Sequence, residues 1–286
     1  TPSTSSAASD VYKRQANPPA DVALIIDNRE LREQIGLTDQ DLKKIQSYCL
    51  NPNTNDFDTF AMVYAGHQFG QFVNQLGDGR GIFLGQTKHD YDLHLKGAGK
   101  TPYSRFGDGR AVLRSSIREY IASEVMNNLN IPSTRAVALF TSEEKVLRDS
   151  YESSAVLLRS SQSHIRFGHF EFFHYRNKSK QVKKLADYAI ENNSLFNESA
   201  EEPYVNFFQT IVQKTAQMIS KWQGVGFCHG VMNTDNFSIL GETFDYGPYA
   251  FMESLNPEFI CNTSDYEGRY RYCLLYTSPS PRDSNL

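Results

Sequence analysis

Hydrophobic and polar residues alternate along short runs in the first half of the chain. Residues 66–109 are dense in glycine and contain the runs "GIFLG" and "YDLHLKG". In the second run the apolar side chains fall on one face and the polar ones on the other, with Tyr91, Leu93 and Leu95 opposite Asp92, His94 and Lys96. This pattern predicts strands joined by tight turns.

Two other segments have the spacing of amphipathic helices. Residues 31–50 predict a helix that is interrupted at Gly36, with Thr38 as the N-cap of its second part. Residues 205–222 predict a long helix, and the two glycines that follow it mark its end.

Further strand candidates precede this long helix. Val, Leu and Ala are abundant at residues 131–141, 145–149 and 154–161. A polar segment, residues 178–202, separates them from the helix. The order of the elements is strands with one helix, then a mostly helical part, which predicts an α+β fold.

Residues 111–131 predict the helix that lies among the strand candidates. One apolar stripe on it contains Leu113, Ile117, Tyr120, Ile121 and Val125. The opposite side is small or apolar apart from Glu119, so we expect this side to be covered as well. The carboxylate of Glu119 would then be partly buried and would need a cationic partner.

Composition and charge narrow the class of protein. Apolar residues make up 40% of the 286 residues and charged residues 22%, which indicates a soluble, globular chain with room for two lobes. The net charge of -4 gives no reason to expect a nucleic-acid partner, and no apolar run has the length of a bilayer span. The four cysteines lack metal-like spacing, which fits a reducing compartment. We expect a cytoplasmic protein, with an organelle as the alternative.

The two ends differ from the rest of the chain. Residues 1–15 and 273–286 are similar to translated sequencing-adaptor sequence, which would make both of them non-native. The alternative is a pair of disordered tails rich in Ser and Pro. We therefore base the fold on residues 16–272.

Four residues occur in the order in which a protein kinase arranges its nucleotide site. A kinase uses a strand Lys, a helix Glu that pairs with it, a catalytic-loop Asn and a later Asp that binds metal ions. Here Lys96 ends a predicted strand, Glu119 lies on the next helix, and Asn236 and Asp245 follow the long helix. The amide and carboxylate oxygens of the last two are hard donors suited to Mg²⁺ that bridges phosphate oxygens.

The kinase base is missing from this pattern. In the kinase loop H-R-D-x-x-x-x-N the Asp accepts the proton, and Val231 stands at that position here. Asp235, directly before Asn236, is the nearest carboxylate that could accept a proton. The alternative is that Asp235 caps its own loop by a local hydrogen bond.

Glycines and cations indicate where a polyanion would bind. The run "LGDGRGIFLG" supplies Gly77, Gly79 and Arg80. A second Gly-Asp-Gly-Arg sequence at residues 107–110 suggests two loops that close over one polyanion, although a hairpin turn is the alternative for each. Arg159, at the end of an apolar strand, is expected to point inward, and Arg166 adds a further cation. Structural ion pairs are the alternative for both arginines.

The histidines give less information. His67, His164, His169 and His174 show no metal-ligand spacing, so we expect them to be packed or hydrogen-bonded rather than ligands. Neither a Gly-x-Ser-x-Gly nor an HExxH arrangement occurs, so nothing indicates a hydrolase.

Five long motifs resemble those of the selenoprotein O family, the YdiU-like protein adenylyltransferases. They are "GHQFG", "LGDGRGIFLG", "LKGAGKTPYSRFGDGRAVLRSSIREY", "RFGHFEFF" and "HGVMNTDNFSILGETFDYGPYAF", and the likeness covers about residues 57–257. The resemblance implies a two-lobed protein-kinase-like fold, with an N-lobe at residues 16–175 and a truncated helical C-lobe at residues 176–272. It also implies transfer of AMP, rather than phosphate, from ATP to hydroxyl side chains of proteins.

The resemblance assigns a role to each candidate residue. Lys96 and Glu119 become the ion pair that grips the phosphates, and Asp235 becomes the proton acceptor. The nucleotide contacts are Gly77, Gly79, Arg80, Lys96, Asp108, Gly109, Arg159, Arg166 and Asp245. The metal ligands are Asn236 and Asp245, for Mg²⁺ or alternatively Mn²⁺. Two other functions stay open: an ordinary kinase with Asp235 as its base, and a nucleotide-binding scaffold without catalysis.

Overall fold

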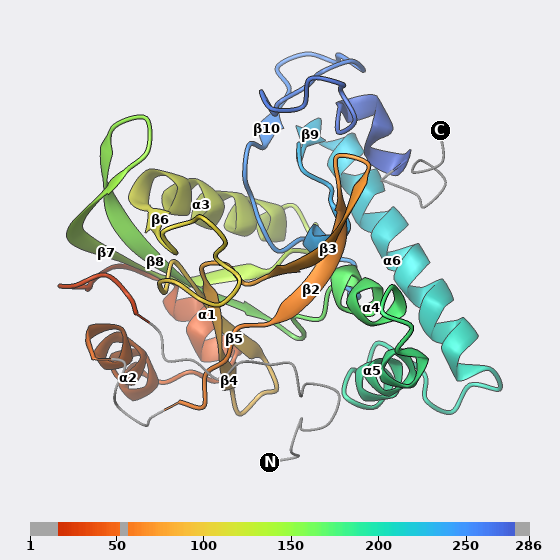
Figure 1. The fold of residues 1–286 in the computed structure, drawn as a ribbon, viewed down its shortest axis with the longest axis horizontal. Helices are drawn as coiled ribbons and strands as arrows, with labels where there is room; N and C mark the ends of the chain where they lie inside the picture. Colours follow the sequence, from red (N-terminus) through yellow and green to blue (C-terminus); the bar gives the residue numbers. More distant parts are fainter. Residues whose placement is uncertain (1–16, 52–56, 278–286) are drawn as a thin grey trace.

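The structure is a computed structural model that describes residues 17–51 and 57–277. An antiparallel sheet forms the centre of the molecule (Figure 1). Its strands run in the order β1-β7-β8-β5-β4, and β6 pairs with β8. Their bounds are β1 (Ala23–Asp27), β4 (Gly81–Gln86), β5 (Asp92–Lys96), β6 (Ala111–Val112), β7 (Arg135–Leu147) and β8 (Tyr151–Ser161). The strands predicted from the "GIFLG" and "YDLHLKG" runs are thus confirmed as β4 and β5.

The register of β5 against β8 places polar side chains from both strands on the same face of this sheet. His94 lies opposite Arg159 in the ladder, and Lys96 lies opposite Leu157. Directly opposed residues share a face, so His94 and Arg159 project to the same side. Leu93 and Leu95, on the other face of β5, belong to the core that the sheet forms with the first two helices. The predicted alternation therefore separates core from polar site.

Two short helices cover that apolar face of the sheet. They are α1 (Arg29–Gln34) and α2 (Asp39–Leu50), and they pack Leu31, Ile35 and Ile45 into the core. Gly36 interrupts the helical run with a positive φ of 79°. Thr38 caps α2, because its Oγ1 accepts a hydrogen bond from the Asp41 N–H at 3.2 Å and its own N–H donates to Asp41 at 2.9 Å. The predicted break and cap are both confirmed.

Helix α3 (Leu113–Asn128) lies on the other face of the sheet, against β7 and β8 (Figure 1). The predicted apolar stripe is wrong in part, because Ile121 is 53% exposed and Val125 is 36% exposed. Its better-buried side carries Glu119, Ala122 and Met126, so the expectation that this side is covered is confirmed. The small residues there allow the helix to approach its neighbours closely and hold Glu119 inside.

Three helices form most of the second half of the chain. They are α4 (Phe167–His174), α5 (Ser179–Glu191) and α6 (Pro203–Gly224), and α6 confirms the predicted long helix. Helix α5 occupies the stretch that was described only as polar. It buries Ala186, Ala189 and Ile190, an apolar stripe with helical spacing that the sequence analysis left unassigned.

The remaining segments wrap around the end of α6. They are β9 (Phe227–Cys228), the 3₁₀ turns η1 (Thr234–Asn236) and η2 (Tyr272–Thr277), and β10 (Ala250–Phe251). Between η1 and β10, Phe237 and Ser238 make isolated bridges to Thr243 and Arg166 and form no regular strand. The expected tails, residues 1–15 and most of 273–286, lie outside the described residues.

A separate hairpin stands beside the sheet and reaches toward the second half of the chain (Figure 1). It consists of β2 (Val63–Gln68) and β3 (Gln71–Gly77), and β2 packs against α4 and η1. The sheet, the hairpin and the loop after α6 therefore meet at one place.

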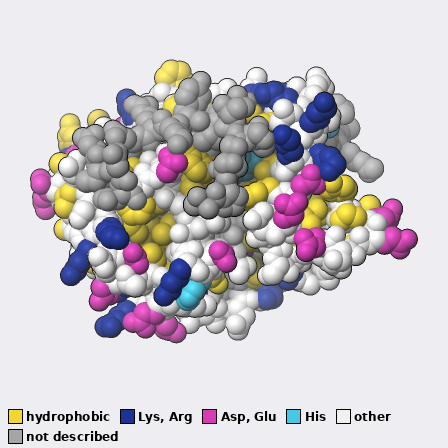
Figure 2. Space-filling model, turned by 90° about the horizontal axis from the view of Figure 1, so that it is seen from below, with side chains coloured by type: hydrophobic (Ala, Val, Ile, Leu, Met, Phe, Trp, Pro, Cys, Tyr) yellow, Lys and Arg dark blue, Asp and Glu magenta, His cyan; other side chains and the backbone are white. Residues whose placement is uncertain are grey.

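The surface shows no field of a single charge on the face seen from below in Figure 2, where acidic and basic side chains are interspersed. None of the helices within residues 17–51 and 57–277 combines the length and the apolar character that a bilayer span requires.

Candidate active site

A cavity of about 340 Å³ lies where the sheet, the β2–β3 hairpin and the loop after α6 meet. It brings together nine of the residues singled out in the sequence: Gly77, Gly79, Arg80, Lys96, Arg159, Arg166, Asp235, Asn236 and Asp245. Glu119 joins them from behind through its contact with Lys96. Residues from distant parts of the chain thus form one polar cavity.

Lys96, the last residue of β5, is the centre of a buried charge cluster. Its Nζ donates to the carboxylate of Glu119 on α3, and to Asp245 Oδ1 at 2.6 Å. Lys96 and Glu119 are both buried, so their charges need each other as partners. The expected pairing of a strand lysine with a helix glutamate is present in the structure.

Two arginines complete the cluster. Arg159 Nη1 donates to Asp245 Oδ1 at 2.9 Å, to Glu119 Oε1 at 3.1 Å and to the Phe244 carbonyl at 2.5 Å. Arg166 Nη1 donates to the Asp235 carbonyl at 2.8 Å and lies 3.4 Å from Asp245 Oδ2. Both guanidinium groups are buried, as the sequence led us to expect for Arg159.

Three cations therefore converge on one carboxylate, that of Asp245. Burial alone would raise its pKa, but the charges of Lys96, Arg159 and Arg166 outweigh burial and hold the pKa well below its usual value. Asp245 is consequently ionised throughout the neutral range. An anionic ligand at this place would meet the same three cations.

Asn236 is held by the residue that replaces the kinase base. Its Nδ2 donates to the Val231 carbonyl at 2.8 Å. The amide nitrogen is therefore engaged, and the amide oxygen is the atom left to bind a cation. The Val231 N–H in turn donates to His229 Nδ1 at 3.3 Å. A backbone carbonyl at position 231 thus orients Asn236, and this function does not require a carboxylate side chain there.

Asp235 lies on the wall of the cavity. Desolvation raises the pKa of its carboxyl to about 6, and the positive charge of Arg166 and a hydrogen bond from Gln68 act in the opposite direction. The group is therefore mostly ionised at pH 7 but close to its titration point. This is the range in which a carboxylate is an effective proton acceptor at neutral pH.

The loop between β3 and β4 forms one rim of the cavity. Gly77 has φ 155°, and a Cβ there would lie 2.7 Å from the Met62 carbonyl, so the close approach excludes a side chain. The buried carboxylate of Asp78 accepts from the Met62 N–H at 3.1 Å and lies 3.2 Å from His94 Nε2. Burial lowers the pKa of His94 to about 4, so this histidine is neutral at pH 7.

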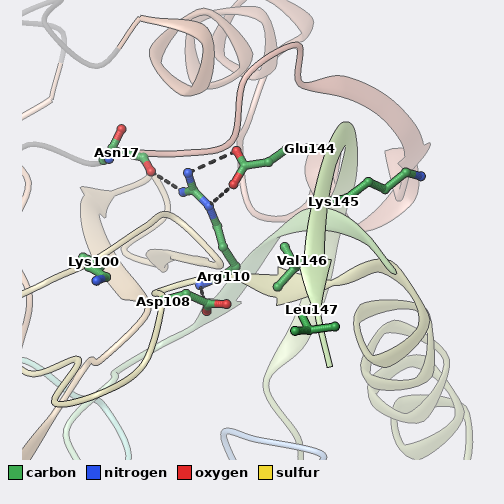
Figure 3. Close-up of a pocket in the computed structure, with 8 residues that line it drawn as sticks. All are labelled: Asn17, Lys100, Asp108, Arg110, Glu144, Lys145, Val146 and Leu147. Atoms are coloured by element: carbon green, nitrogen blue, oxygen red, sulfur yellow. Dashed lines mark hydrogen bonds and ion pairs between the residues drawn. The ribbon is translucent and has the colours of Figure 1, made fainter. Parts of the chain in front are cut away.

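Asp108 and Gly109 lie elsewhere. Asp108 lines a second cavity of about 370 Å³, shown in Figure 3. Its carboxylate accepts a hydrogen bond of 2.7 Å from Arg148, which does not line that cavity. Arg110 points into the same cavity and pairs with Glu144 at 2.8 Å (Figure 3). Gly109 has φ 77° and packs against Gly99. The two Gly-Asp-Gly-Arg loops therefore do not share one cavity, although Ser104 and Arg105 of the second loop do line the first.

Sequence reasoning missed several residues of the first cavity. Tyr64, Gln68, Asp78, His94, Tyr103 and Asn233 also line it. Two of them carried a signal: Asp78 lies between the predicted nucleotide-binding glycines, and His94 shares the polar face of β5 with Lys96. Gln68 and Asn233 depend on contacts between remote segments, which no local pattern shows.

All four histidines considered above contact a neighbouring group, and the His174 ring packs edge-on against Tyr175. His67 Nδ1 lies 2.7 Å from Glu171, His169 Nδ1 accepts from the Arg166 N–H at 2.8 Å, and His164 stacks on His94. Across residues 17–51 and 57–277 no group of three or more His, Cys, Asp or Glu side chains could hold a metal ion. The Asn236 amide and the Asp245 carboxylate nevertheless suit Mg²⁺, which proteins commonly hold by one or two side chains together with substrate phosphates.

An α+β fold that gathers buried cations, an ionised aspartate and an asparagine in one cavity has the features of a nucleotide-dependent transferase. The family model described as "Protein adenylyltransferase SelO" matches residues 1–275, and the chain belongs to this family. The family resemblance noted in the sequence is thereby confirmed.

The chain is also similar to curated bacterial proteins named "Protein nucleotidyltransferase YdiU". It is 49% identical over 265 residues to the one from Marinomonas sp. (strain MWYL1), covering 91% of this chain and 55% of that protein. It is 55% identical over 219 residues to the one from Pseudomonas entomophila (strain L48), covering 75% and 45%. It is 56% identical over 216 residues to the one from Enterobacter sp. (strain 638), covering 74% and 45%. The chain therefore spans about half the length of these relatives.

Proposed function

We propose that this chain carries the nucleotide site of a protein adenylyltransferase, which transfers AMP from ATP to Ser, Thr or Tyr hydroxyls of proteins. The observation that supports this most strongly is the convergence of Lys96, Arg159 and Arg166 on Asp245, beside Asn236, in one cavity. Five basic side chains line this cavity, namely Arg80, Lys96, Arg105, Arg159 and Arg166. They outnumber the carboxylates of Asp78, Asp235 and Asp245 on the wall and of Glu119 behind Lys96, and this excess of positive charge favours a polyphosphate ligand.

In the proposed reaction, whose attack at the α-phosphorus is taken from the family, each residue has one role. The hydroxyl oxygen of the acceptor protein attacks the α-phosphorus, and its proton passes to the Asp235 carboxylate. The bond from the α-phosphorus to the bridging oxygen breaks, and pyrophosphate leaves with that electron pair. The three cations stabilise the negative charge that develops on the leaving group. Asn236 and Asp245 would hold Mg²⁺, or Mn²⁺ as the alternative, which neutralises phosphate charge when bound.

The arrangement also supports a two-lobed kinase-like architecture. Residues 16–175 would form the N-lobe, with the sheet and α3, and residues 176–272 would form part of a helical C-lobe, with α5 and α6. The Lys96–Glu119 contact between β5 and α3, and the position of Asp245 against it, are the features that a kinase fold uses. We place the protein in the cytoplasm, in keeping with its free cysteines and its bacterial relatives.

ATP labelled separately at its α- and γ-phosphorus tests the reaction. The chain is incubated with Mg²⁺ and each labelled ATP, and incorporation into itself and into added unfolded proteins is measured. We expect label from the α position and none from the γ position. Asp245→Ala should abolish incorporation, whereas Asp187→Ala, at a partly exposed carboxylate on α5 that does not line the cavity, should leave it unchanged.

Two results would favour other functions. Label from the γ position alone would show a kinase and reject AMP transfer. ATP binding without any incorporation would favour a non-catalytic scaffold. Binding of ATP is therefore measured in the same samples by calorimetry.

A further inference from the structure

The tip of the β2–β3 hairpin lies against the loop that carries Asp235. The His67 N–H donates to Thr234 Oγ1 at 2.8 Å, and the Phe69 N–H donates to the Tyr270 hydroxyl at 2.7 Å. The His67 ring lies 2.7 Å from Glu171, which also accepts from Thr234 at 2.6 Å. These contacts fix the hairpin tip without any contribution from the side chain of Gln68.

Gln68 itself reaches the carboxylate of Asp235. Its Nε2 lies 3.3 Å from Oδ1 and 3.2 Å from Oδ2, so the amide donates to both oxygens. Because an amide has no pKa in the working range, it orients the carboxylate without competing for a proton. Gln68 also lines the cavity, so the side of the carboxylate that it holds adjoins the open space.

Gly66 supplies the room for this contact. It lies two positions before Gln68 on β2, and therefore on the same face of the strand. A Cβ at position 66 would lie 2.9 Å from Asp235 Oδ1 and 3.2 Å from Thr234 Oγ1. Any side chain there would push the carboxylate away from its present position. One face of β2 thus offers the Asp235 carboxylate both the space at Gly66 and the hydrogen-bond donor of Gln68.

We propose that Gln68 is a positioning residue that holds the Asp235 carboxylate toward the reacting hydroxyl, with Gly66 as the gap that the carboxylate needs. This inference rests on the proposed role of Asp235 as proton acceptor. It assigns a catalytic purpose to the "GHQFG" motif, whose function the sequence alone did not reveal.

The kinetic test compares Gln68→Ala and Gly66→Ala with a matched control, Gln71→Ala. Gln71 is exposed, on the same hairpin, and pairs with Gln68 in the ladder. We expect both test variants to lower kcat for AMP transfer about 10- to 100-fold, the effect of a small misplacement of a reacting group. The affinity for ATP should stay within about twofold of the wild type, because the cation cluster is untouched. The control should behave as the wild type.

A double-mutant cycle separates positioning from a general structural role. In an Asp235→Asn background, Gln68→Ala should cause no further loss of kcat, because the group it positions is already inactive. A loss of the same size in both backgrounds would overturn the proposal. A Gln68→Ala enzyme with wild-type kcat, or a parallel loss of ATP affinity, would overturn it too.

A spectroscopic readout keeps the inference testable if the chain transfers no AMP and the proposed function fails. Infrared spectra are recorded on protein labelled with ¹³C-aspartate, and the band that Asp235→Asn removes is assigned to Asp235. Loss of two donated hydrogen bonds in Gln68→Ala should shift this band, while Gln71→Ala should not. An unshifted band would show that Gln68 does not hold the carboxylate.

Discussion

The buried charge cluster makes Glu119→Gln the most informative single substitution. Glu119 contacts Lys96 and, at 3.1 Å, Arg159. The side chains of these three residues are 6%, 9% and 4% exposed, so water contributes little to their solvation. Glutamine has nearly the same shape as glutamate and still offers one oxygen, so the substitution removes the charge with little change in packing.

The size of the effect follows from burial. Removing one partner of a buried ion pair costs about 3–5 kcal/mol of unfolding free energy. Here Asp245 remains as a partner of both cations, at 2.6 Å from Lys96 and 2.9 Å from Arg159. We therefore expect Glu119→Gln to lower the unfolding free energy by about 3 kcal/mol, the lower end of that range. For a domain of this size, that corresponds to a decrease in Tm of about 6–12 °C.

Urea and thermal unfolding, followed by circular dichroism at pH 7, measure this loss. Glu33→Gln is the matched control, because Glu33 pairs with Arg29 at 2.9 Å on the exposed surface, where both side chains are more than half exposed. We expect no measurable change for the control. A Glu119→Gln protein as stable as the wild type would refute the view that these charges depend on each other inside the fold.

Three further predictions concern single residues of the cavity. Because burial raises the folded pKa of Asp235 to about 6, its neutral form favours the folded state below its unfolded pKa, and this contribution is lost as pH rises through about 6. Asp235→Asn should therefore unfold at higher urea than the wild type at pH 8, with the difference gone near pH 4. It should also lower AMP transfer by about 10²- to 10⁴-fold, as loss of a proton acceptor does, and an active variant would contradict that role. Gly77→Ala should cost about 1–3 kcal/mol in urea unfolding, because a positive φ and the nearby Met62 carbonyl both disfavour a side chain, and a neutral result would contradict the described turn. Arg159→Lys should weaken ATP binding at least tenfold in calorimetry, since a lysine cannot reproduce contacts to Asp245 and the Phe244 carbonyl together, and unchanged affinity would remove Arg159 from the site.

The elements that the sequence predicted are those with strong local signals. Gly36 and Thr38 marked a helix break and a cap that depend on neighbouring residues alone. The apolar face of α3 was assigned in part to the wrong side, because Ile121 and Val125 were expected to be buried and are exposed. Which side of a helix is covered depends on tertiary packing. Here Leu113, Ile117 and Tyr120 pack on the sheet, whereas Ala122 and Met126 pack on the core around α6.

The same distinction applies to the site. Lys96 could be found because it shares the polar face of a regular strand, and Asn236 and Asp245 could be found from their order along the chain. The contact between Gln68 and Asp235 joins residues 167 positions apart, and no periodicity records it. The placement of Asp108 in a second cavity likewise results from the path of a loop without regular structure.

The position of Asp245 late in the chain has a consequence for folding during synthesis. Lys96, Arg159 and Arg166 are all synthesised well before Asp245, the carboxylate on which they converge. Until the ribosome has released that residue, Lys96 and Arg159 have Glu119 as a buried partner and Arg166 has Asp78, but the carboxylate that joins all three cations is missing. We therefore expect the ligand site to form only once Asp245 has been made, and a polypeptide that stops short of Asp245 to be degraded by proteases more readily.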